Sequence, residues 1–262
     1  MKLGVIGLGH VGRAMQSLFV PFADVVPYDL LTHSTYPEDE LAKCAFSIIC
    51  VDTPMGDDGS CNVDNVRAAV DRVPTQRLLV KSTVPPGFTE ALVIETGKEI
   101  CFSPEYFGES NYLSSVVAAG PSGMPFVIVG GRPEHRRTML DDLSALLGPE
   151  KVYFQCSSVE AELIKYMENA YLATKVTFVN QFYDLCETFN ADWHTVREGW
   201  LLDPRIERSH SEVFSSERGF GGRCLPKDVS AIISAAGDAG CDPYFLRAVL
   251  EANRRFRNVP QG

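Results

Sequence analysis

Short apolar runs alternate with amphipathic segments through the first 147 residues. The runs are rich in β-branched side chains and predict strands at 2–7, 24–28, 46–51, 78–81, 100–102 and 126–129. Apolar residues at helical spacing predict helices at 11–19, 63–73 and 134–147. This alternation predicts a parallel, doubly wound sheet whose ligand crevice lies at the carboxyl ends of its strands.

Helical segments fill the rest of the chain. Ser157 and Glu160 form a capping-box pattern before a helix that runs to about Phe189 and is long enough to connect two domains. Further helices are predicted at 192–202, 226–236 and 243–256, and the irregular run 204–218 is predicted to be a mobile loop. The predicted fold class is α/β: a Rossmann-like, doubly wound parallel sheet in a domain of residues 1–156, then the long connecting helix and an all-helical domain over 157–262.

A glycine pattern, GLGHVG at 7–12, lies between the first predicted strand and the first predicted helix. Gly7 and Gly9 allow a tight turn and the close approach of a pyrophosphate, and Gly12 lets the helix pack on the strand. Asp29 stands 20 residues after Gly9, where a carboxylate binds ribose hydroxyls and repels a 2′-phosphate. The sequence therefore predicts that NAD is bound in preference to NADP.

Three polar turns follow the third, fourth and fifth predicted strands. They are Asp52-Thr53-Pro54, Ser82-Thr83-Val84-Pro85 and Ser103-Pro104-Glu105. Each one alone is compatible with an ordinary turn. Because parallel strands bring all three to one edge of the sheet, we expect them to form the floor of a site.

The run GFGGRCLPKD at 219–228 places Cys224 between a glycine-rich loop and a predicted helix start. Pro226 suits the first helical turn, where its missing N–H costs nothing. The helix dipole, Arg223 and Lys227 all favour a thiolate. A single cysteine is more often a buried structural residue, but this combination indicates that Cys224 is a nucleophile.

Glu162, Lys165 and Asn169 share one stripe of the long helix, because they are spaced by three and four residues. One interpretation is a solvated, ion-paired face. The other is that Lys165 and Asn169 are oxyanion donors, provided that the stripe faces the crevice.

The helical half carries more apolar stripes than one thin helical layer can bury, notably at Phe178, Phe182, Phe189 and Phe245. Exposed, these stripes would exceed the patch that a soluble monomer normally tolerates. We therefore expect a homodimer through residues 157–256.

Composition narrows the classes of partner and compartment. The 262 residues carry a formal net charge of −10 and no lysine- or arginine-rich run, which argues against a nucleic-acid partner. No apolar stretch approaches the roughly 20 residues that span a bilayer, and Met1 leads directly into a strand, so neither a membrane partner nor a signal peptide is expected. Eight cysteines without a CxxC pair indicate a reducing cytoplasm, with no disulfide framework and no metal site.

The chain resembles the UDP-glucose/GDP-mannose dehydrogenase family over essentially its whole length. The motifs that carry the resemblance are GLGHVG at 7–12, VDTP at 51–54, KSTVPPG at 81–87, SPEYFGES at 103–110, AELIKYMENAY at 161–171, DPRIE at 203–207 and GFGGRCLPKD at 219–228. Members of that family oxidise the primary alcohol of a nucleotide sugar to a carboxylate, using two NAD per turnover. The resemblance implies NAD as cofactor and a nucleotide sugar, a UDP-sugar before others, as substrate.

The resemblance also implies roles for single residues. Cys224 traps the aldehyde as a thiohemiacetal and then carries a thioester. Lys165 and Asn169 stabilise the oxyanion, Asp228 orients water or acts as a base, Glu105 is the acid–base group with Thr83 nearby, and Arg205 reaches the sugar nucleotide across a dimer interface. The cofactor-binding residues expected are Gly7, Gly9, His10, Val11, Gly12, Asp29, Thr53, Pro54, Ser82, Thr83 and Lys227; the substrate-binding residues expected are Glu105, Tyr106, Phe107, Lys165, Asn169, Arg205, Phe220, Gly221 and Cys224.

The chain departs from the family pattern at its C-terminal end, where the family's third, nucleotide-binding domain is expected to be missing. Two alternatives stay open. A single-step β-hydroxyacid dehydrogenase also joins a Rossmann domain to a helical domain with a lysine–asparagine helix, but it needs no counterpart of Cys224. An NAD-binding regulatory or scaffolding remnant explains the missing domain, but not the retention of Cys224, Lys165, Asn169 and Asp228.

Overall fold

The structure, a computed structural model, describes residues 1–106 and 123–258. These residues divide into two compact units, the first made of residues 1–106 and 123–165 and the second of residues 166–258. The long helix α7 (Ser158–Thr188) contributes its first turns to the first unit and the remainder to the second.

A seven-stranded sheet forms the centre of the first unit. Its strands are β1 (Lys2–Ile6), β2 (Asp24–Tyr28), β3 (Phe46–Ile49), β4 (Arg77–Val80), β5 (Glu99–Phe102), β6 (Phe126–Gly130) and β7 (Val152–Cys156), in the order β2-β1-β3-β4-β5-β6-β7. The first five strands pair in parallel. The chain order reverses between β1 and β3, and α/β sheets bind ligands at such a point, beyond the carboxyl ends of the strands. The predicted α/β sheet is confirmed.

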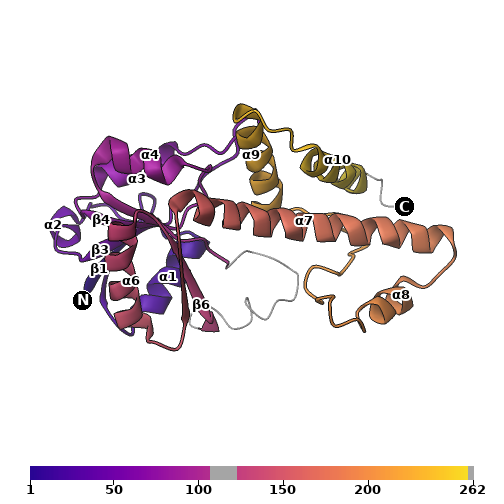
Figure 1. The fold of residues 1–262 in the computed structure, drawn as a ribbon, viewed down its shortest axis with the longest axis horizontal. Helices are drawn as coiled ribbons and strands as arrows, with labels where there is room; N and C mark the ends of the chain where they lie inside the picture. Colours follow the sequence, from indigo (N-terminus) through magenta and orange to yellow (C-terminus); the bar gives the residue numbers. More distant parts are fainter. Residues whose placement is uncertain (107–122, 259–262) are drawn as a thin grey trace. The chain divides into compact units, whose positions relative to one another are not determined.

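Helices cover both faces of this sheet (Figure 1). On one face, α3 (Asp64–Arg72), α4 (Phe88–Thr96) and the start of α7 pack against alternate strand residues such as Leu78 and Val80. On the other face, α1 (His10–Phe19) and α6 (Pro133–Leu147) pack against the intervening residues, such as Leu79. The alternation follows from the period of two along a strand. A short helix, α2 (Glu38–Leu41), precedes β3.

The sheet and the helices that cover it differ from the sequence prediction at β6, β7 and α4. β6 runs antiparallel to β5, so the sheet is mostly rather than wholly parallel. β7 was not predicted, because it is an edge strand whose apolar Val152 and Phe154 are exposed and give no inward pattern. α4 was not predicted either, because its apolar residues surround the helix and leave no polar face to mark a helical period.

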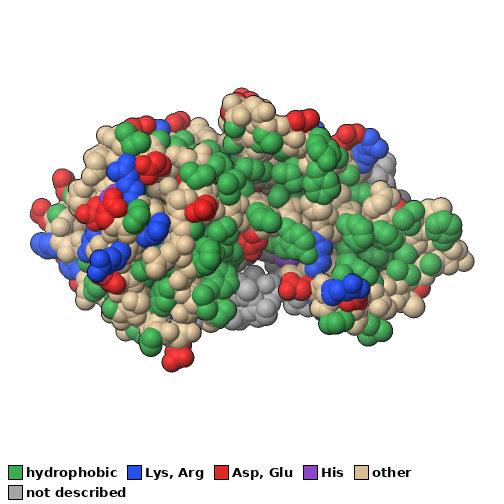
Figure 2. All heavy atoms as spheres, in the orientation of Figure 1, with side chains coloured by type: hydrophobic (Ala, Val, Ile, Leu, Met, Phe, Trp, Pro, Cys, Tyr) green, Lys and Arg blue, Asp and Glu red, His purple; other side chains and the backbone are tan. Residues whose placement is uncertain are grey.

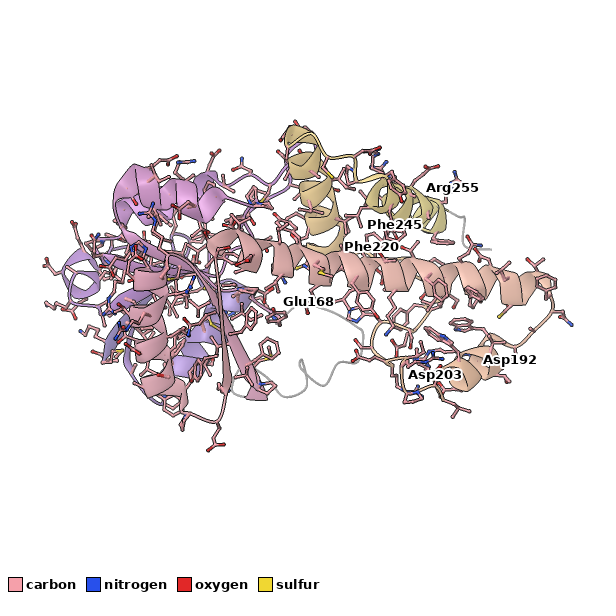
Figure 3. The ribbon with its side chains drawn as sticks, viewed as in Figure 1. Glu168, Asp192, Asp203, Phe220, Phe245 and Arg255 are labelled. Carbon is pink, nitrogen blue, oxygen red and sulfur yellow. The ribbon has the colours of Figure 1, made fainter. Side chains whose placement is uncertain are left out.

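The second unit is helical within its described residues, as predicted. Besides α7 it contains α8 (Trp193–Trp200), α9 (Cys224–Asp238) and α10 (Tyr244–Asn258). Its core joins Ala173 and Val176 of α7 to Val229 of α9 and Val249 of α10, with Phe220 fully buried among them (Figure 3).

Side-chain caps fix the starts of α7 and α8, where the sequence predicted them. The Ser157 backbone N–H donates to Glu160 Oε2 at 2.6 Å, and the Glu160 N–H donates to Ser157 Oγ at 3.3 Å, which confirms the capping box before α7. The Asp192 carboxylate accepts from the Thr195 N–H at 2.7 Å at the start of α8 (Figure 3).

The run 204–218, predicted to be a mobile loop, is anchored by a buried cation. Arg197 of α8 is 8% exposed; it donates to the Ser211 carbonyl at 3.0 Å and pairs with Glu212 at 2.8 Å. Arg218, at the end of the run, pairs with Asp184 of α7 at 2.7 Å. The irregular backbone is therefore tied to two helices.

Candidate functional site

The glycine turn after β1 has the shape that a dinucleotide requires. Gly7 has φ +87°, and a Cβ atom there would lie 2.8 Å from the Cys50 backbone. A Cβ atom on Gly12 would overlap the Gly7 carbonyl, whereas Gly9 faces open space. The turn leads into the first residues of α1, His10 and Val11, whose helix N-terminus favours an anion. These observations fit a pyrophosphate over Gly9.

Asp29 lies at the end of β2 and contacts this turn. Its carboxylate accepts from the Leu8 N–H at 2.7 Å and from the Leu31 N–H at 2.9 Å. These backbone hydrogen bonds, the one from Leu8 first, hold the pKa of Asp29 below its usual range, so the side chain is anionic at neutral pH. A fixed carboxylate beside the glycine turn suits ribose hydroxyls.

The three polar turns meet at the carboxyl edge of the sheet, as their strand order requires. Ser82 is buried, and its hydroxyl donates to the Val51 carbonyl at 2.6 Å. Thr53 is also buried, while the adjoining Pro54 is exposed. The turn after β3 is thus bonded directly to the turn after β4.

Lys81 joins the turn after β4 to the turn after β5. Its ammonium donates to Ser103 Oγ and to the Pro104 carbonyl, each at 3.0 Å. Burial of the ammonium lowers the pKa of Lys81 to about 8. Lys81 is not among the residues that the sequence predicts for the site, although a lysine at the end of an apolar strand marks a cation held near the protein interior.

Glu105 and Lys165 form a buried pair at the same edge. Lys165 Nζ donates to the Glu105 carbonyl at 2.6 Å and lies 3.4 Å from Glu105 Oε1; the two residues are 4% and 7% exposed. The Tyr106 ring centre lies 5.9 Å from Lys165 Nζ. Phe107, the other predicted substrate contact in this motif, lies outside the described residues.

Cys224 is the first residue of α9 and is partly exposed, which is the position at a helix start that the sequence predicted. Asp228 follows one turn later and is 2% exposed. Its carboxylate accepts from Asn169 Nδ2 at 2.5 Å and from Lys227 Nζ at 2.6 Å. The second unit therefore brings together a helix start that carries a thiol and a buried carboxylate that accepts two hydrogen bonds.

Two residues of the Cys224 motif have roles in the structure that the sequence did not predict. Lys227 pairs with the buried Asp228 carboxylate, so its charge serves that group. Phe220 is fully buried, and its backbone N–H and carbonyl both bond to Asn253 of α10. Phe220 therefore anchors the loop that precedes Cys224.

The three glycines of this loop differ in their surroundings. Cβ atoms at Gly219 and Gly221 would collide with Asn253 and with Arg257 of α10, so these two glycines permit packing against a helix. Gly222 has φ +74° and open space beside it. Of the three, only Gly222 leaves the backbone open to a ligand.

The other predicted residues of the long helix and of the DPRIE motif are placed as follows. Glu162, Lys165 and Asn169 are 0%, 4% and 5% exposed, so their stripe faces inward and is not a solvated face. Arg205 is exposed and pairs with Asp203 at 2.5 Å. Together, the mostly parallel sheet, the glycine turn and the anchored Asp29 define a dinucleotide-binding protein of the Rossmann class.

Comparison with known proteins specifies this class further. Residues 17–145 match the NAD binding domain, and residues 159–255 the central domain, of the UDP-glucose/GDP-mannose dehydrogenase family. The chain belongs to this family.

Relatives and solved structures agree with this assignment. The chain is 30% identical to the UDP-glucose 6-dehydrogenase TuaD of Bacillus subtilis, over 98% of this chain and 63% of the relative, and 32% identical to a UDP-glucose 6-dehydrogenase of Pseudomonas aeruginosa, over 87% and 52%. It resembles the structure of a UDP-glucose dehydrogenase from Pyrobaculum islandicum with a TM-score of 0.82 and 28% identity, over 97% of this chain and 68% of that one. The chain thus spans about half to two thirds of the length of its relatives.

A 3-hydroxyisobutyrate dehydrogenase from Mycobacterium tuberculosis shares the fold alone, with a TM-score of 0.71 at 14% identity, over 97% of this chain and 93% of that one. Among the described helices, none combines the length and the apolar character needed to cross a membrane.

Proposed function

We propose that the protein is an NAD-dependent nucleotide-sugar dehydrogenase that oxidises a primary alcohol to a carboxylate in two steps. The observation that carries the proposal is the arrangement around α9: Cys224 at the helix start, with Asp228 one turn later held by Asn169 and Lys227. A single-step oxidation needs neither a thiol nor a carboxylate placed to direct water. Because the two bacterial relatives described above are UDP-glucose 6-dehydrogenases, a UDP-sugar is the first substrate to test.

The chain's own residues suit the binding of NAD. Gly7, Gly9 and Gly12 form the turn for the pyrophosphate, Asp29 binds the adenosine ribose, and Thr53, Pro54, Ser82 and Thr83 line the carboxyl edge where the nicotinamide half belongs. When bound, NAD would supply the oxidant, with one NAD molecule taking up a hydride in each of the two steps.

Cys224 links the two oxidations. After the first step converts the alcohol to an aldehyde, the Cys224 sulfur adds to the carbonyl carbon, and the oxygen takes up a proton to give a thiohemiacetal. The second step removes two electrons and two protons from that carbon and its hydroxyl, leaving a thioester. Water then adds, the carbon–sulfur bond breaks, and the carboxylate leaves as the thiol is restored.

Four further residues act on the substrate oxygen and on the water that attacks the thioester. The Lys165 ammonium and the Asn169 amide stabilise the developing oxyanion. The Asp228 carboxylate orients the water that attacks the thioester, and Glu105, with Thr83 nearby, exchanges the proton of the alcohol. Arg205, exposed in one chain, contacts the nucleotide sugar bound to a second chain.

The purified chain with NAD and a panel of UDP- and GDP-sugars tests this function, followed by absorbance of NADH. We expect two NADH for each carboxylate formed. One NADH per product with activity on a β-hydroxyacid would establish the single-step alternative, whereas NAD binding without turnover on any sugar would establish the regulatory remnant.

We propose a homodimer through the helical unit. Side chains on one stripe of α7 are exposed, including Met167 at 76%, Phe178 at 47%, Phe182 at 41% and Phe189 at 78%. Figure 2 shows apolar side chains gathered over this helix. An apolar patch of this kind marks an interaction surface.

We expect sedimentation at twice the chain mass of 28.8 kDa at micromolar concentration. Phe182→Glu should yield monomers, because it places a charge in the apolar stripe. Phe22→Glu, at an exposed aromatic in the first unit, should stay dimeric. A monomeric wild type would remove both the dimer and the role of Arg205 across it.

NAD should bind more tightly than NADP, and Asp29→Asn should reduce this preference by at least about tenfold, because the variant keeps an acceptor but loses the charge that repels a 2′-phosphate. Asp29→Ala should also loosen the glycine turn, since the Leu8 N–H loses its partner. Calorimetric titration with both cofactors measures the ratio. Equal or tighter binding of NADP to the wild type contradicts the prediction.

Two further proposals concern the domain bounds and the cellular location. We propose that residues 1–156 form the NAD-binding domain and residues 157–262 the helical domain that carries Cys224. We also propose a cytoplasmic location, since the eight cysteines, all within the described residues, are thiols, as a reducing compartment favours.

A further inference from the structure

Glu162 ties the start of α7 to the loop that carries Thr83. Its side chain is fully buried; Oε2 accepts from the Gly87 N–H at 2.5 Å and Oε1 from the Thr89 N–H at 2.9 Å. Both donors belong to the first turn of α4, whose N-cap, Gly87, has no side chain to cap it. Glu162 therefore caps α4 from a different helix.

Two lysines hold the neighbouring turn in a similar way. Lys165, three residues after Glu162 on α7, donates to the Glu105 carbonyl at 2.6 Å. Lys81, immediately before the loop Ser82–Gly87, donates to the Pro104 carbonyl at 3.0 Å. The loop after β4, the turn after β5 and the start of α7 are thus joined pairwise by three charged side chains of the first unit.

Capping a helix with the buried Glu162 carboxylate carries a large free-energy cost. Among the described residues no cation lies within 4 Å of it, and burial raises its pKa above the usual range. A buried carboxylate without a cation carries a large desolvation penalty. A serine or aspartate at the N-cap is the usual local cap, but Gly87 has φ +90°, a conformation that L side chains rarely adopt. What a local cap cannot do is fix the start of α4 against α7.

We infer that Glu162 is a positioning residue of the reaction, which locks the loop Ser82–Gly87 onto α7 and so holds Thr83 at a fixed separation from Lys165. The inference rests on the proposed function, in which Thr83 and Lys165 belong to the reacting site. Glu162 touches neither substrate nor cofactor in this role; it acts through the backbone of Gly87 and Thr89.

Glu162→Gln tests the inference, because the amide keeps the size of the side chain but turns an N–H donor toward one of the two backbone donors. We expect kcat to fall by about 10- to 100-fold, since a misplacement of about 1 Å costs on the order of 10² in rate. The KM for NAD should change less than about threefold, and hydrogen exchange at the Gly87 and Thr89 amides should quicken at least about tenfold. Glu187→Gln, the same change at an exposed position of α7, should leave all three unchanged.

Glu162→Asp is a second variant in case Glu162→Gln does not fold at the assay temperature. It keeps the charge but is one methylene too short to reach both donors, so kcat should fall by about tenfold. A folded Glu162 variant with wild-type kcat, or with unchanged exchange at Gly87 and Thr89, overturns the positioning role alone. A wild type that oxidises no sugar in the panel overturns the proposed function, and the positioning role with it.

Discussion

Cys224→Ser should abolish formation of the carboxylate product while NAD affinity stays within about twofold of wild type. The serine hydroxyl is a far weaker nucleophile than a thiolate at neutral pH, and an ester resists the hydrolysis that a thioester undergoes. We expect net acid formation to fall by at least about 10³-fold. Quantifying NADH and the acid measures this loss, and intact-mass analysis detects any stalled covalent adduct. Acid formation at the wild-type rate would remove Cys224 from the mechanism.

Thiol reactivity tests Cys224 without turnover. Iodoacetamide should label it ahead of the exposed Cys241 at neutral pH, because Cys224 begins a helix whereas Cys241 does not. Cys44 should react slowly, because burial raises the pKa of its thiol to about 11. A Cys241→Ser chain provides the matched control, and saturating NAD with substrate should slow the labelling. Labelling of Cys224 no faster than Cys241 would indicate that the motif is retained for structure only.

The parts of the fold that the sequence predicted are those encoded by local patterns. The strand, glycine turn and helix at the N-terminus depend on residues that are neighbours in the chain, and so does the capping box of Ser157 and Glu160. The start of α9 at Cys224 belongs to the same class. β7 and α4 lack such a pattern, because an exposed edge strand and an all-round apolar helix show neither of the usual periods.

The sequence predicts which residue types form the candidate site, but not their hydrogen-bond and ion-pair partners. Spacing alone groups Glu162 with Lys165 and Asn169, yet its hydrogen-bond donors lie 73 and 75 residues earlier in the chain. The sequence predicts Lys227 as a cation for cofactor and thiol, but it does not show that the Asp228 carboxylate is buried beside it. The sequence does not reveal the cap that Glu162 provides, because α4 lacks a helical period and its N-cap is a glycine without a capping side chain.

Lys165→Met should lower kcat by about 10²- to 10³-fold, the usual effect of removing one donor to a developing oxyanion. The same change removes the ammonium from the buried Glu105 carboxylate, which lies 3.4 Å away, and should reduce the free energy of unfolding by about 3 kcal/mol. Steady-state rates and denaturant unfolding measure the two effects separately. The Asn169 amide is neutral, so it cannot replace the lost charge.

Lys165→Met in the Glu105→Gln variant tests whether Lys165 acts as an oxyanion donor or only as the ion-pair partner of Glu105. If Lys165 acts on the substrate, Lys165→Met should still lower kcat by about 10²-fold in that background, because the donor is lost whatever residue 105 is. The loss of stability should shrink there to about 1 kcal/mol, because no buried carboxylate is left without its ammonium. A double variant no slower than Glu105→Gln alone would show that Lys165 serves the reaction only by holding Glu105, and the role of oxyanion donor would then pass to Asn169 or to the backbone.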